Sequence, residues 1–325
     1  MAEFLVVVSD DRYGGRYDEE RAVLEPCGAE VVVTNGATPA EVAKNCADAD
    51  GIMANLAPFP RETIERLKKC KIISRYGVGY DNVDVKACTE KGIILANVPD
   101  YCAEDVSDQA LALLMGCVRK IARRDAQVRA GMWNIGRSDP IYRTCGKVFT
   151  FLGFGLIGRA LLRKSRGLNF SRILVYDPYL SEDTIKGYGC EKTEWEEALA
   201  LADYISVHMP LNKETTGIVG YDAFKLMKPN AMIINTSRGP IIDEDALVDA
   251  LKTGKINSAG LDVHKIEPLP MDSKLRELPN CILSDHVSWY SEESFVELKT
   301  KVAQNIRDVL TGGAPKYVVN KDLLK

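Results

Sequence analysis

Two side chains near the end of the chain are suited to moving a proton. His286 lies in the segment Ser284-Asp-His286-Val-Ser-Trp289, and Glu267 lies upstream, directly before Pro268. Imidazole exchanges protons near neutral pH, and a neighbouring carboxylate favours its protonated form. If the fold brings the two together, His286 is an acid and base for a small molecule and Glu267 tunes it. The alternative for Glu267 is a solvated side chain in a proline-rich loop.

Three further polar residues are candidates for a site. His208 ends a predicted strand, Tyr204 to His208, where a structural role and a ligand-lining role are both consistent with the pattern. His264 is equally consistent with a surface residue. Arg238 follows the predicted strand Ala231 to Asn235, and its planar guanidinium suits a bidentate hold on a carboxylate. The alternative for Arg238 is a place in a surface turn.

A glycine-rich turn in mid-chain predicts a dinucleotide site. The apolar run Val148 to Leu152 leads into Gly153-Phe-Gly155-Leu-Ile-Gly158, and an amphipathic helix over Ile157 to Arg166 is predicted to follow. Glycines at this spacing allow a tight turn, close approach of N–H groups to a pyrophosphate and close packing of helix on strand. Asp177 ends a second apolar strand, where it would bind the ribose hydroxyls and repel the 2′-phosphate of NADP, so NAD is favoured. The alternative is a structural glycine turn with a surface aspartate.

A third segment is suited to hold an anion. Arg75-Tyr-Gly77-Val-Gly79 follows a predicted strand, and its two glycines leave backbone N–H groups that form an anion nest. We expect Tyr76, Tyr101 and Trp289 to define the pocket for the substrate side chain near Arg238. The alternative for Trp289 is a hinge tryptophan in a core.

Composition narrows the class of protein. The chain has 325 residues, 46% of them hydrophobic, which is enough for about two domains. A net charge of −4 gives no electrostatic footprint for nucleic acid, and no apolar run is long enough to span a membrane. Nine scattered cysteines lack the spacing of a metal site or a disulfide framework. We therefore expect a cytoplasmic protein without metal, whose partners are small molecules or protein.

The elements that must position these residues alternate between strands and helices. This pattern predicts an α/β fold with two doubly wound parallel-sheet domains, Rossmann-like and flavodoxin-like, and a cleft between them. Residues 101–287 are predicted to form the cofactor domain, interrupting a substrate domain made of 1–100 and 288–325. The predicted strands are Phe4 to Val8, Glu30 to Val33, Gly51 to Ala54, Lys71 to Arg75, Ile93 to Ala96, Val148 to Leu152, Ile173 to Tyr176, Tyr204 to His208, Ala231 to Asn235, Ser258 to Val263 and Cys281 to Ser284. The predicted helices include Pro39 to Cys46, Arg61 to Lys69, a long one after Tyr101 with apolar positions up to Ile121, and Glu292 to Thr311.

These motifs together resemble the D-isomer-specific 2-hydroxyacid dehydrogenases over nearly the full length of the chain. The resemblance implies hydride transfer between NAD and a small 2-oxo or 2-hydroxy acid. It also implies that Arg238 binds and polarises the acid, His286 is the acid and base, and Glu267 stabilises its protonated form. The motifs that carry it are Arg75-Tyr-Gly-Val-Gly-Tyr-Asp-Asn-Val-Asp84, Asn97-Val-Pro99, Gly153 to Gly158, Asn235-Thr-Ser-Arg-Gly239 and Asp285-His286.

The resemblance assigns further residues to substrate and cofactor. It implies a homodimer formed largely through the cofactor domain, and it implies that Asp262 holds the nicotinamide carboxamide. The implied substrate-binding residues are Arg75, Tyr76, Gly77, Val78, Gly79, Tyr101 and Trp289. The implied cofactor-binding residues are Gly153, Gly155, Leu156, Ile157, Gly158, Tyr176, Asp177, Pro178, His208, Pro210, Thr236, Ser237, Asp262 and His286.

Within the family, the chain looks most like the branch of the C-terminal-binding proteins. It is also similar to phosphoglycerate dehydrogenase, but we expect it to lack the extra C-terminal regulatory domain that many of those enzymes carry. The first branch suggests an alternative, an NAD(H)-sensing corepressor-like protein with slow dehydrogenase activity. Two positions depart from the family pattern. Ser284-Asp285 replaces the usual proline or threonine before the histidine, and His264 replaces a common aromatic residue. Because both positions lie near the predicted site, the resemblance does not identify the side chain of the substrate.

Overall fold

The computed structural model describes residues 2–133 and 139–324. The chain divides into two compact units, Met1–Cys102 with Ser291–Lys325 and Ala103–Tyr290. Each unit is built on one sheet, and every strand pair in both sheets is parallel. The predicted fold class, two doubly wound α/β domains, is confirmed.

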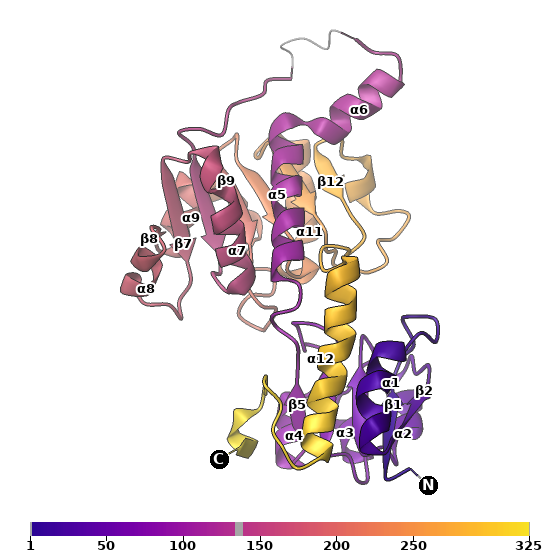
Figure 1. Ribbon diagram of the computed structural model, residues 1–325. Coiled ribbons are helices and arrows are strands. Elements are labelled where there is room, and N and C mark those ends of the chain that lie inside the picture. The colour runs from indigo at the N-terminus through magenta and orange to yellow at the C-terminus, as the bar shows by residue number, and fades with distance from the viewer. Residues whose placement is uncertain (1, 134–138, 325) are drawn as a thin grey trace. The chain divides into compact units, whose positions relative to one another are not determined.

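The first unit has a five-stranded sheet of order β2-β1-β3-β4-β5. Helices α1 and α12 cover one face, and α2, α3 and α4 cover the other (Figure 1). The strands are β1 (Phe4–Val8), β2 (Ala29–Val33), β3 (Gly51–Ala54), β4 (Ile72–Arg75) and β5 (Ile94–Ala96). The helices are α1 (Asp18–Leu24), α2 (Pro39–Cys46), α3 (Arg61–Glu65), α4 (Val85–Glu90) and α12 (Glu292–Leu310).

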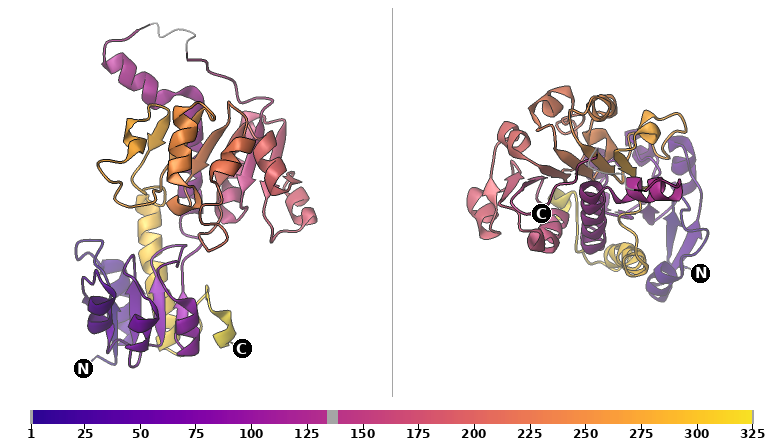
Figure 2. Two further views of the ribbon diagram at one scale, coloured as in Figure 1. Left: turned by 180° about the vertical axis from the view of Figure 1, so that it is seen from behind. Right: turned by 90° about the horizontal axis from the view of Figure 1, so that it is seen from above.

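The second unit has a seven-stranded sheet of order β12-β11-β10-β9-β6-β7-β8. Helices α5 and α7 pack on one face, and α9, α10 and α11 pack on the other (Figure 2). The strands are β6 (Val148–Leu152), β7 (Arg172–Tyr176), β8 (Glu191–Lys192), β9 (Tyr204–Val207), β10 (Met232–Asn235), β11 (Ser258–Leu261) and β12 (Cys281–Leu283). The helices are α5 (Ala103–Arg119), α6 (Ile121–Arg129), α7 (Leu156–Ser165), α8 (Glu182–Gly187), α9 (Trp195–Leu201), α10 (Tyr221–Leu226) and α11 (Glu244–Lys252).

Local sequence explains why these elements begin where they do. Thr38 accepts a hydrogen bond from Glu41 N, and the Glu41 side chain returns one to the cap, so α2 starts with a capping box. Ser291 and Ser294 form the same device at the start of α12. The central strands are fully buried and mostly apolar, as is typical of a parallel sheet covered on both faces.

The prediction of one long helix running to Ile121 is wrong at its C-terminal end. Helix α5 ends at Arg119, Lys120 adopts a left-handed conformation with φ of 56°, and α6 begins at Ile121. The Lys120 ammonium binds the carboxylate of Asp139, which lies 19 positions downstream. Apolar spacing carries no information about such an ion pair, so the break was not predicted.

Two smaller predictions also need correction. The predicted helix from Arg61 to Lys69 ends at Glu65, because the chain then turns and Lys68 N donates to Ala47 O at 2.9 Å. The sheet of the second unit has a seventh strand, β8, beyond the six that were predicted. Its two residues are charged, so it gives no apolar signal.

Candidate active site

The candidate residues of the second unit follow neighbouring strands of one parallel sheet. Carboxyl ends of parallel strands meet at one edge, which is where open α/β sheets bind ligands. Strands β10, β11 and β12 are adjacent in the sheet. Arg238 follows the first of these strands, Glu267 the second and His286 the third. The topology therefore brings the three predicted catalytic residues to the same part of the sheet edge.

His286 and Glu267 are in direct contact. His286 Nδ1 lies 2.7 Å from Glu267 Oε2, and both side chains are about one third exposed, at 34% and 36%. A carboxylate oxygen only accepts, so Nδ1 carries the proton and Nε2 is the ring nitrogen that can exchange a proton with a ligand. Burial alone would raise the pKa of Glu267, but the hydrogen bond from His286 and one from His264 N outweigh it and lower that pKa. Glu267 is therefore ionised at neutral pH.

The backbone of His286 is held in an uncommon conformation. Its φ is 58°, in the left-handed region that residues other than glycine seldom adopt. His286 N donates to Asp262 O at 2.8 Å, and Val287 N and Ser288 N donate to the Asp262 carboxylate at 3.1 and 3.0 Å. Asp262, which is fully buried, thus anchors the turn that presents the imidazole. Its predicted contact with the nicotinamide carboxamide stays a prediction.

Arg238 lies on a turn that packs against the loop after β11. Asn235 Nδ2 donates to Arg238 O at 2.9 Å, and the guanidinium donates to Ser237 O at 2.9 Å. A Cβ on Gly239 would lie 2.0 Å from the carbonyl carbon of His264. Only glycine permits this approach, which places the turn of Arg238 against the loop that leads to Glu267.

The glycine turn has the open cradle that a pyrophosphate needs. Gly153 has φ of 87°, and a Cβ there would lie 2.8 Å from the backbone of His208. A Cβ on Gly155 would meet no atom within 4 Å, and no side chain caps the N-terminus of α7. The exposed Leu156 and half-buried Ile157 begin that helix. The uncapped N–H groups and the space beside them fit a dinucleotide phosphate.

Asp177 is held next to this turn. Its Oδ2 accepts from Phe154 N and its Oδ1 from Tyr179 N, both at 3.0 Å. Each carboxylate oxygen has a second lone pair, so both remain able to accept from ribose hydroxyls. Its neighbour Tyr176 packs edge-on against Trp195, with ring centroids 5.2 Å apart, and Pro178 is exposed. The carboxylate is thus oriented by the ends of β6 and β7, as the predicted ribose site requires.

The other predicted cofactor residues lie along the same edge. His208 Nε2 lies 2.8 Å from Ser206 Oγ, and burial lowers the pKa of His208 to about 4, so the ring is neutral at pH 7. The hydroxyl of Thr236 is buried and has no hydrogen-bond partner in the described residues. Ser237 Oγ donates to the carbonyl of Met209, and Pro210 next to it is exposed. An orphaned hydroxyl at this edge is consistent with a polar ligand there.

The low pKa of His208 predicts a loss of stability in mild acid. Its folded pKa lies below the ordinary 6.5, so the unfolded chain binds this proton first and stability falls as pH drops from about 6.5 towards about 4. The slope is at most about 1.4 kcal/mol per pH unit. We expect His208→Gln to flatten the dependence of the unfolding free energy on pH in this range. Urea unfolding followed by tryptophan fluorescence measures it, and parallel curves for both proteins would contradict the prediction.

In the first unit, predicted substrate residues cluster after β4. Gly77 has φ of 129°, and a Cβ there would lie 1.9 Å from a guanidinium nitrogen of Arg75 and 3.8 Å from Tyr101 Oη. Arg75, Gly77 and Tyr101 are therefore neighbours. Val78 O accepts from Asn97 Nδ2 at 2.7 Å. The roles of this segment, including that of Gly79, and of Trp289 in the second unit stay predictions.

Tyr76 points into the interior of the first unit. It is 3% exposed, and its hydroxyl donates to Glu20 Oε1 at 2.8 Å. Burial and the nearby Glu20 carboxylate raise the pKa of this phenol well above its ordinary value. Tyr76 thus fixes the backbone beside Gly77, and its predicted substrate contact stays a prediction.

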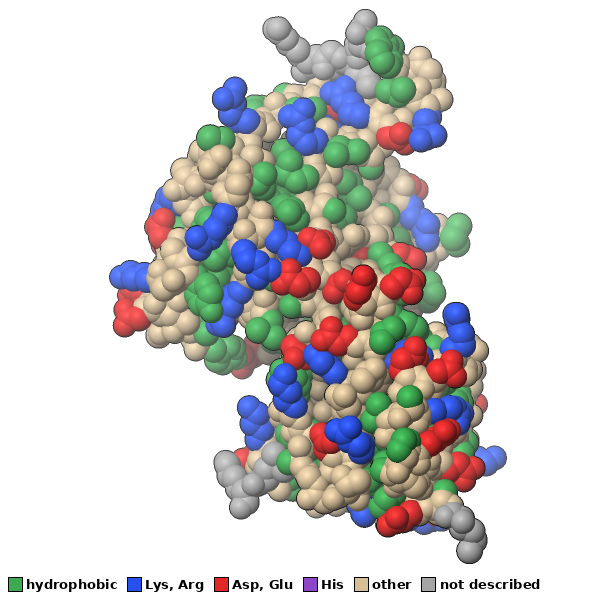
Figure 3. Space-filling model, viewed as in Figure 1, with side chains coloured by type: hydrophobic (Ala, Val, Ile, Leu, Met, Phe, Trp, Pro, Cys, Tyr) green, Lys and Arg blue, Asp and Glu red, His purple; other side chains and the backbone are tan. Residues whose placement is uncertain are grey.

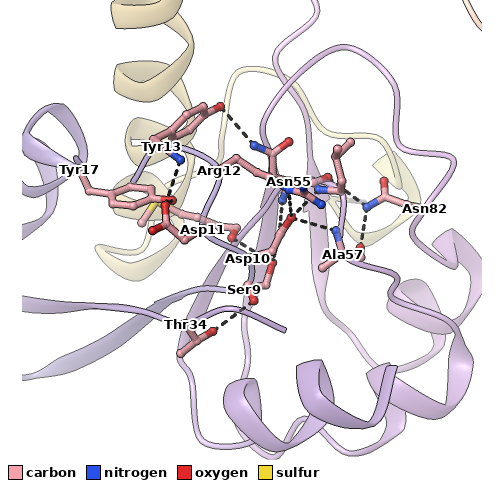
Figure 4. A network of polar contacts seen from close by, with 12 residues as sticks. Ser9, Asp10, Asp11, Arg12, Tyr13, Tyr17, Thr34, Asn55, Ala57 and Asn82 are labelled. Carbon is pink, nitrogen blue, oxygen red and sulfur yellow. Dashed lines mark hydrogen bonds and ion pairs between the residues drawn. The ribbon is translucent and has the colours of Figure 1, made fainter. Parts of the chain in front are cut away.

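Sequence reasoning missed a buried aspartate at the same edge. Asp10 follows β1 and accepts hydrogen bonds from the N–H groups of Asn55, Leu56 and Ala57 at 2.8 to 3.1 Å (Figure 4). Asn82 Nδ2 donates to the carbonyls of Asn55 and Ala57. Together these bonds fix the loop after β3. The only sequence signal was an acidic residue directly after an apolar strand.

Among the described residues, no group of three or more His, Cys, Asp or Glu is placed to hold a metal ion. No helix in the described ranges is long and apolar enough to cross a membrane. On the face shown in Figure 3, both basic and acidic side chains lie on the surface of each unit.

Comparison with known proteins decides the family. Residues 111–288 match the model of the D-isomer specific 2-hydroxyacid dehydrogenase, NAD binding domain. The chain belongs to this family. The matched domain binds NAD, so NAD is the cofactor of this dehydrogenase. The glycine turn as the place where NAD binds stays a prediction.

Curated relatives and solved structures extend the match beyond this domain. The chain is 37% identical over 282 residues to a glyoxylate reductase of Korarchaeum cryptofilum, covering 86% of this chain and 85% of the relative. It is 37% identical over 306 residues to a D-3-phosphoglycerate dehydrogenase of Methanocaldococcus jannaschii, covering 94% of this chain but only 58% of that longer protein. A glyoxylate reductase structure from Paecilomyes thermophila superimposes with a TM-score of 0.89 at 29% identity, covering 99% of this chain and 100% of the other.

These matches bear on the two branches considered from the sequence. All three proteins are named as reductases or dehydrogenases. They confirm the family and the similarity to phosphoglycerate dehydrogenase, and they give no support to the corepressor alternative.

Proposed function

We propose that this dehydrogenase reduces a small 2-oxo acid to the D-2-hydroxy acid with NADH, using His286, Glu267 and Arg238. The observation that carries the proposal is the 2.7 Å contact between His286 Nδ1 and Glu267 Oε2, which leaves Nε2 as the ring nitrogen that can exchange a proton. The relatives named as glyoxylate reductases favour a substrate with a small side chain.

The residues divide the chemistry between them. When bound, NADH would supply the hydride that reduces the carbonyl carbon. Arg238 binds the substrate carboxylate through its planar guanidinium and polarises the carbonyl. His286 Nε2 gives a proton to the carbonyl oxygen, which becomes the hydroxyl, and the ionised Glu267 stabilises the imidazolium before the transfer. The reverse reaction uses the same groups, with the neutral imidazole as base.

The test is oxidation of NADH against a panel of 2-oxo acids. The panel comprises glyoxylate, hydroxypyruvate, phosphohydroxypyruvate, pyruvate and a methylthio-2-oxo acid. We expect turnover with at least one of the small acids and a strong loss in Arg238→Lys, because lysine keeps the charge but not the bidentate geometry. Absence of turnover with every acid by a folded, NADH-binding preparation would overturn the proposal.

The orientation of Asp177 predicts a preference for NADH over NADPH. Replacing Asp177 with Ser removes the anion that would repel the 2′-phosphate, while a hydroxyl still accepts hydrogen bonds at the end of β7. We expect the ratio of kcat/KM for NADH to that for NADPH to fall by at least about tenfold, since one charge contact is worth on the order of 1.4 kcal/mol. The matched control is Asp183→Ser on the exposed first turn of α8, which should leave the ratio unchanged. A wild-type enzyme that prefers NADPH would contradict the role of Asp177.

We also propose that the enzyme is a homodimer formed through the second unit. Exposed apolar side chains gather on and after α6, a helix with no buried residue. Apolar side chains that remain exposed in this way mark interaction surfaces. They are Ile121, Val128, Met132 and Trp133. Light scattering of the purified protein at micromolar concentration tests the mass, and a monomer would contradict the proposal.

A further inference from the structure

Ser284 uses every polar group it has to connect the elements around the acid and base pair. Its N–H donates to Leu261 O at 2.9 Å, and its hydroxyl donates to Asp262 Oδ1 at 2.6 Å. The same hydroxyl accepts from Gln109 Nε2 of α5 at 3.1 Å. The Ser284 carbonyl lies 2.8 Å from His264 Nε2. One residue therefore links the ends of β11 and β12 to the helix that covers them.

His264 connects the same two strand ends from the other side. A carbonyl oxygen only accepts, so His264 Nε2 carries the proton that is donated to Ser284 O. The backbone N–H of His264 donates to Glu267 Oε1 at 2.9 Å. The ring is 7% exposed, and its Nδ1 is buried without a hydrogen-bond partner in the described residues. The backbone of His264 thus holds the Glu267 carboxylate, and the side chain of His264 holds the loop that leads to His286.

Asp262 connects Ser284 to the turn that contains His286. Besides the Ser284 hydroxyl, the Asp262 carboxylate accepts from Val287 N and Ser288 N, and its carbonyl accepts from His286 N. These bonds hold His286, whose φ of 58° lies in the left-handed region of backbone conformation. Conformations of this kind persist only where neighbouring structure determines them.

We infer that Ser284 and His264 are positioning residues that hold His286 and Glu267 in the geometry for proton transfer. The inference rests on the proposed function. Neither residue is required to touch the substrate. The Ser284 hydroxyl orients Asp262 and with it the turn of His286, while the His264 ring ties that turn to the loop of Glu267. A small displacement of a catalytic group is enough to lower the rate of proton transfer strongly.

The experiment compares Ser284→Ala with Ser284→Thr and with the control Ser258→Ala. Ser258 is also buried, on β11 of the same sheet, but lies outside this network. We expect Ser284→Ala to lower kcat with the best 2-oxo acid by about tenfold, with KM for NADH changed less than about twofold. Ser284→Thr restores the hydroxyl and should recover most of kcat, and Ser258→Ala should retain it. Equal kcat in Ser284→Ala and wild type, or no recovery in Ser284→Thr, would overturn the inference.

A double-mutant cycle with His264→Phe tests the connection between the two residues. Both act on one turn, so we expect the losses of kcat to be non-additive, with the double variant about as slow as the slower single variant. Additive losses would overturn a joint role.

Proton NMR separates failure of this inference from failure of the proposed function. The resonance of the His286 Nδ1–H bonded to Glu267, identified by its loss in His286→Asn, should broaden or shift in Ser284→Ala and stay in place in Ser284→Thr. If the wild-type protein shows no turnover but the resonance changes in Ser284→Ala as expected, the proposed function is refuted and the positioning role stands. An unchanged resonance in Ser284→Ala would refute the positioning role.

Discussion

Replacing His286 with Asn is expected to lower kcat for reduction of a 2-oxo acid by about 10²- to 10⁴-fold, the usual contribution of a positioned acid and base. Asparagine is among the residues that best tolerate a left-handed backbone, so it keeps the φ of 58° without an imidazole. The dissociation constant of NADH should stay within about threefold, because the glycine turn and Asp177 lie after other strands. Steady-state kinetics and NADH fluorescence titration measure the two quantities.

A second variant shows whether the loss is chemical. His286→Gly also accepts the positive φ and leaves space for a small molecule. Adding imidazole to this variant should restore part of kcat, whereas a variant that had lost its fold would not respond. Glu267→Gln keeps a hydrogen-bond acceptor for Nδ1 but removes the charge, so a smaller loss of kcat is expected. If His286→Asn retains more than a tenth of the wild-type kcat, His286 is not the acid and base.

Lys299→Met is expected to destabilise the first unit by roughly 3–5 kcal/mol, the cost of breaking a buried ion pair. Lys299 on α12 is 1% exposed, and its ammonium contacts the carboxylates of Glu19 and Glu20 and donates to Arg16 O at 2.7 Å. Glu20 is fully buried, and burial raises its pKa. Methionine matches the length of lysine but leaves the Glu20 carboxylate without its cation. Three aromatic rings also surround the ammonium at 5.0 to 5.7 Å, those of Tyr13, Tyr17 and Phe295.

Chemical unfolding followed by far-ultraviolet circular dichroism measures this loss. Tryptophan fluorescence would not, since Trp133, Trp195 and Trp289 all belong to the second unit. Lys301→Met on the same helix is the matched control. Its ammonium pairs with Asp100 at 2.8 Å but is one quarter exposed, so a loss of about 1 kcal/mol or less is expected.

A double variant identifies the cause of the destabilisation. Lys299→Met with Glu20→Gln removes the two buried charges and leaves only Glu19, whose side chain is 30% exposed, so most of the lost stability should return. If the double variant is as unstable as Lys299→Met alone, packing around the lysine stem, rather than the unpaired charge, explains the loss.

Strands and helix starts could be predicted because their signals are local. The run Val148–Leu152 is apolar except for Thr150 because its strand is covered on both faces, and the strand has the predicted bounds. The helix Pro39–Cys46 also has the predicted bounds, since Thr38, Pro39 and Glu41 mark its start. These patterns need no knowledge of the rest of the chain.

Buried charges could not be predicted because their partners lie far away in the sequence. Lys299 contacts Glu19 from 280 positions away, and Asp10 accepts from residues that lie 45 to 47 positions downstream. In the sequence alone, nothing distinguishes Lys299 or Asp10 from an ordinary charged residue on the surface. The left-handed Lys120, which separates α5 from α6, was missed for the same reason.

The pairing of His286 with Glu267 was predicted as an implication of the family motif, and the structure places their side chains in contact. The supports were not predicted. Ser284 was noticed only as a departure from the family pattern. His264 was equally consistent with a surface residue, but it is buried. Their mutual hydrogen bond exists because β11 and β12 are neighbours in the sheet. The sequence indicates which residues follow a strand. Which of these residues come into contact depends on the order of the strands in the sheet.

Stereospecific reduction of NAD distinguishes an NAD-dependent dehydrogenase of D-2-hydroxy acids from one that oxidises L-2-hydroxy acids. The purified enzyme is given NAD and, separately, the D and L enantiomers of glycerate and lactate, and formation of NADH is followed by absorbance. We expect NADH formation with a D enantiomer at least about a hundredfold faster than with its L enantiomer, since a misplaced hydroxyl cannot reach His286 Nε2 in the same complex. Equal rates with both enantiomers, or faster oxidation of the L acid, would contradict it.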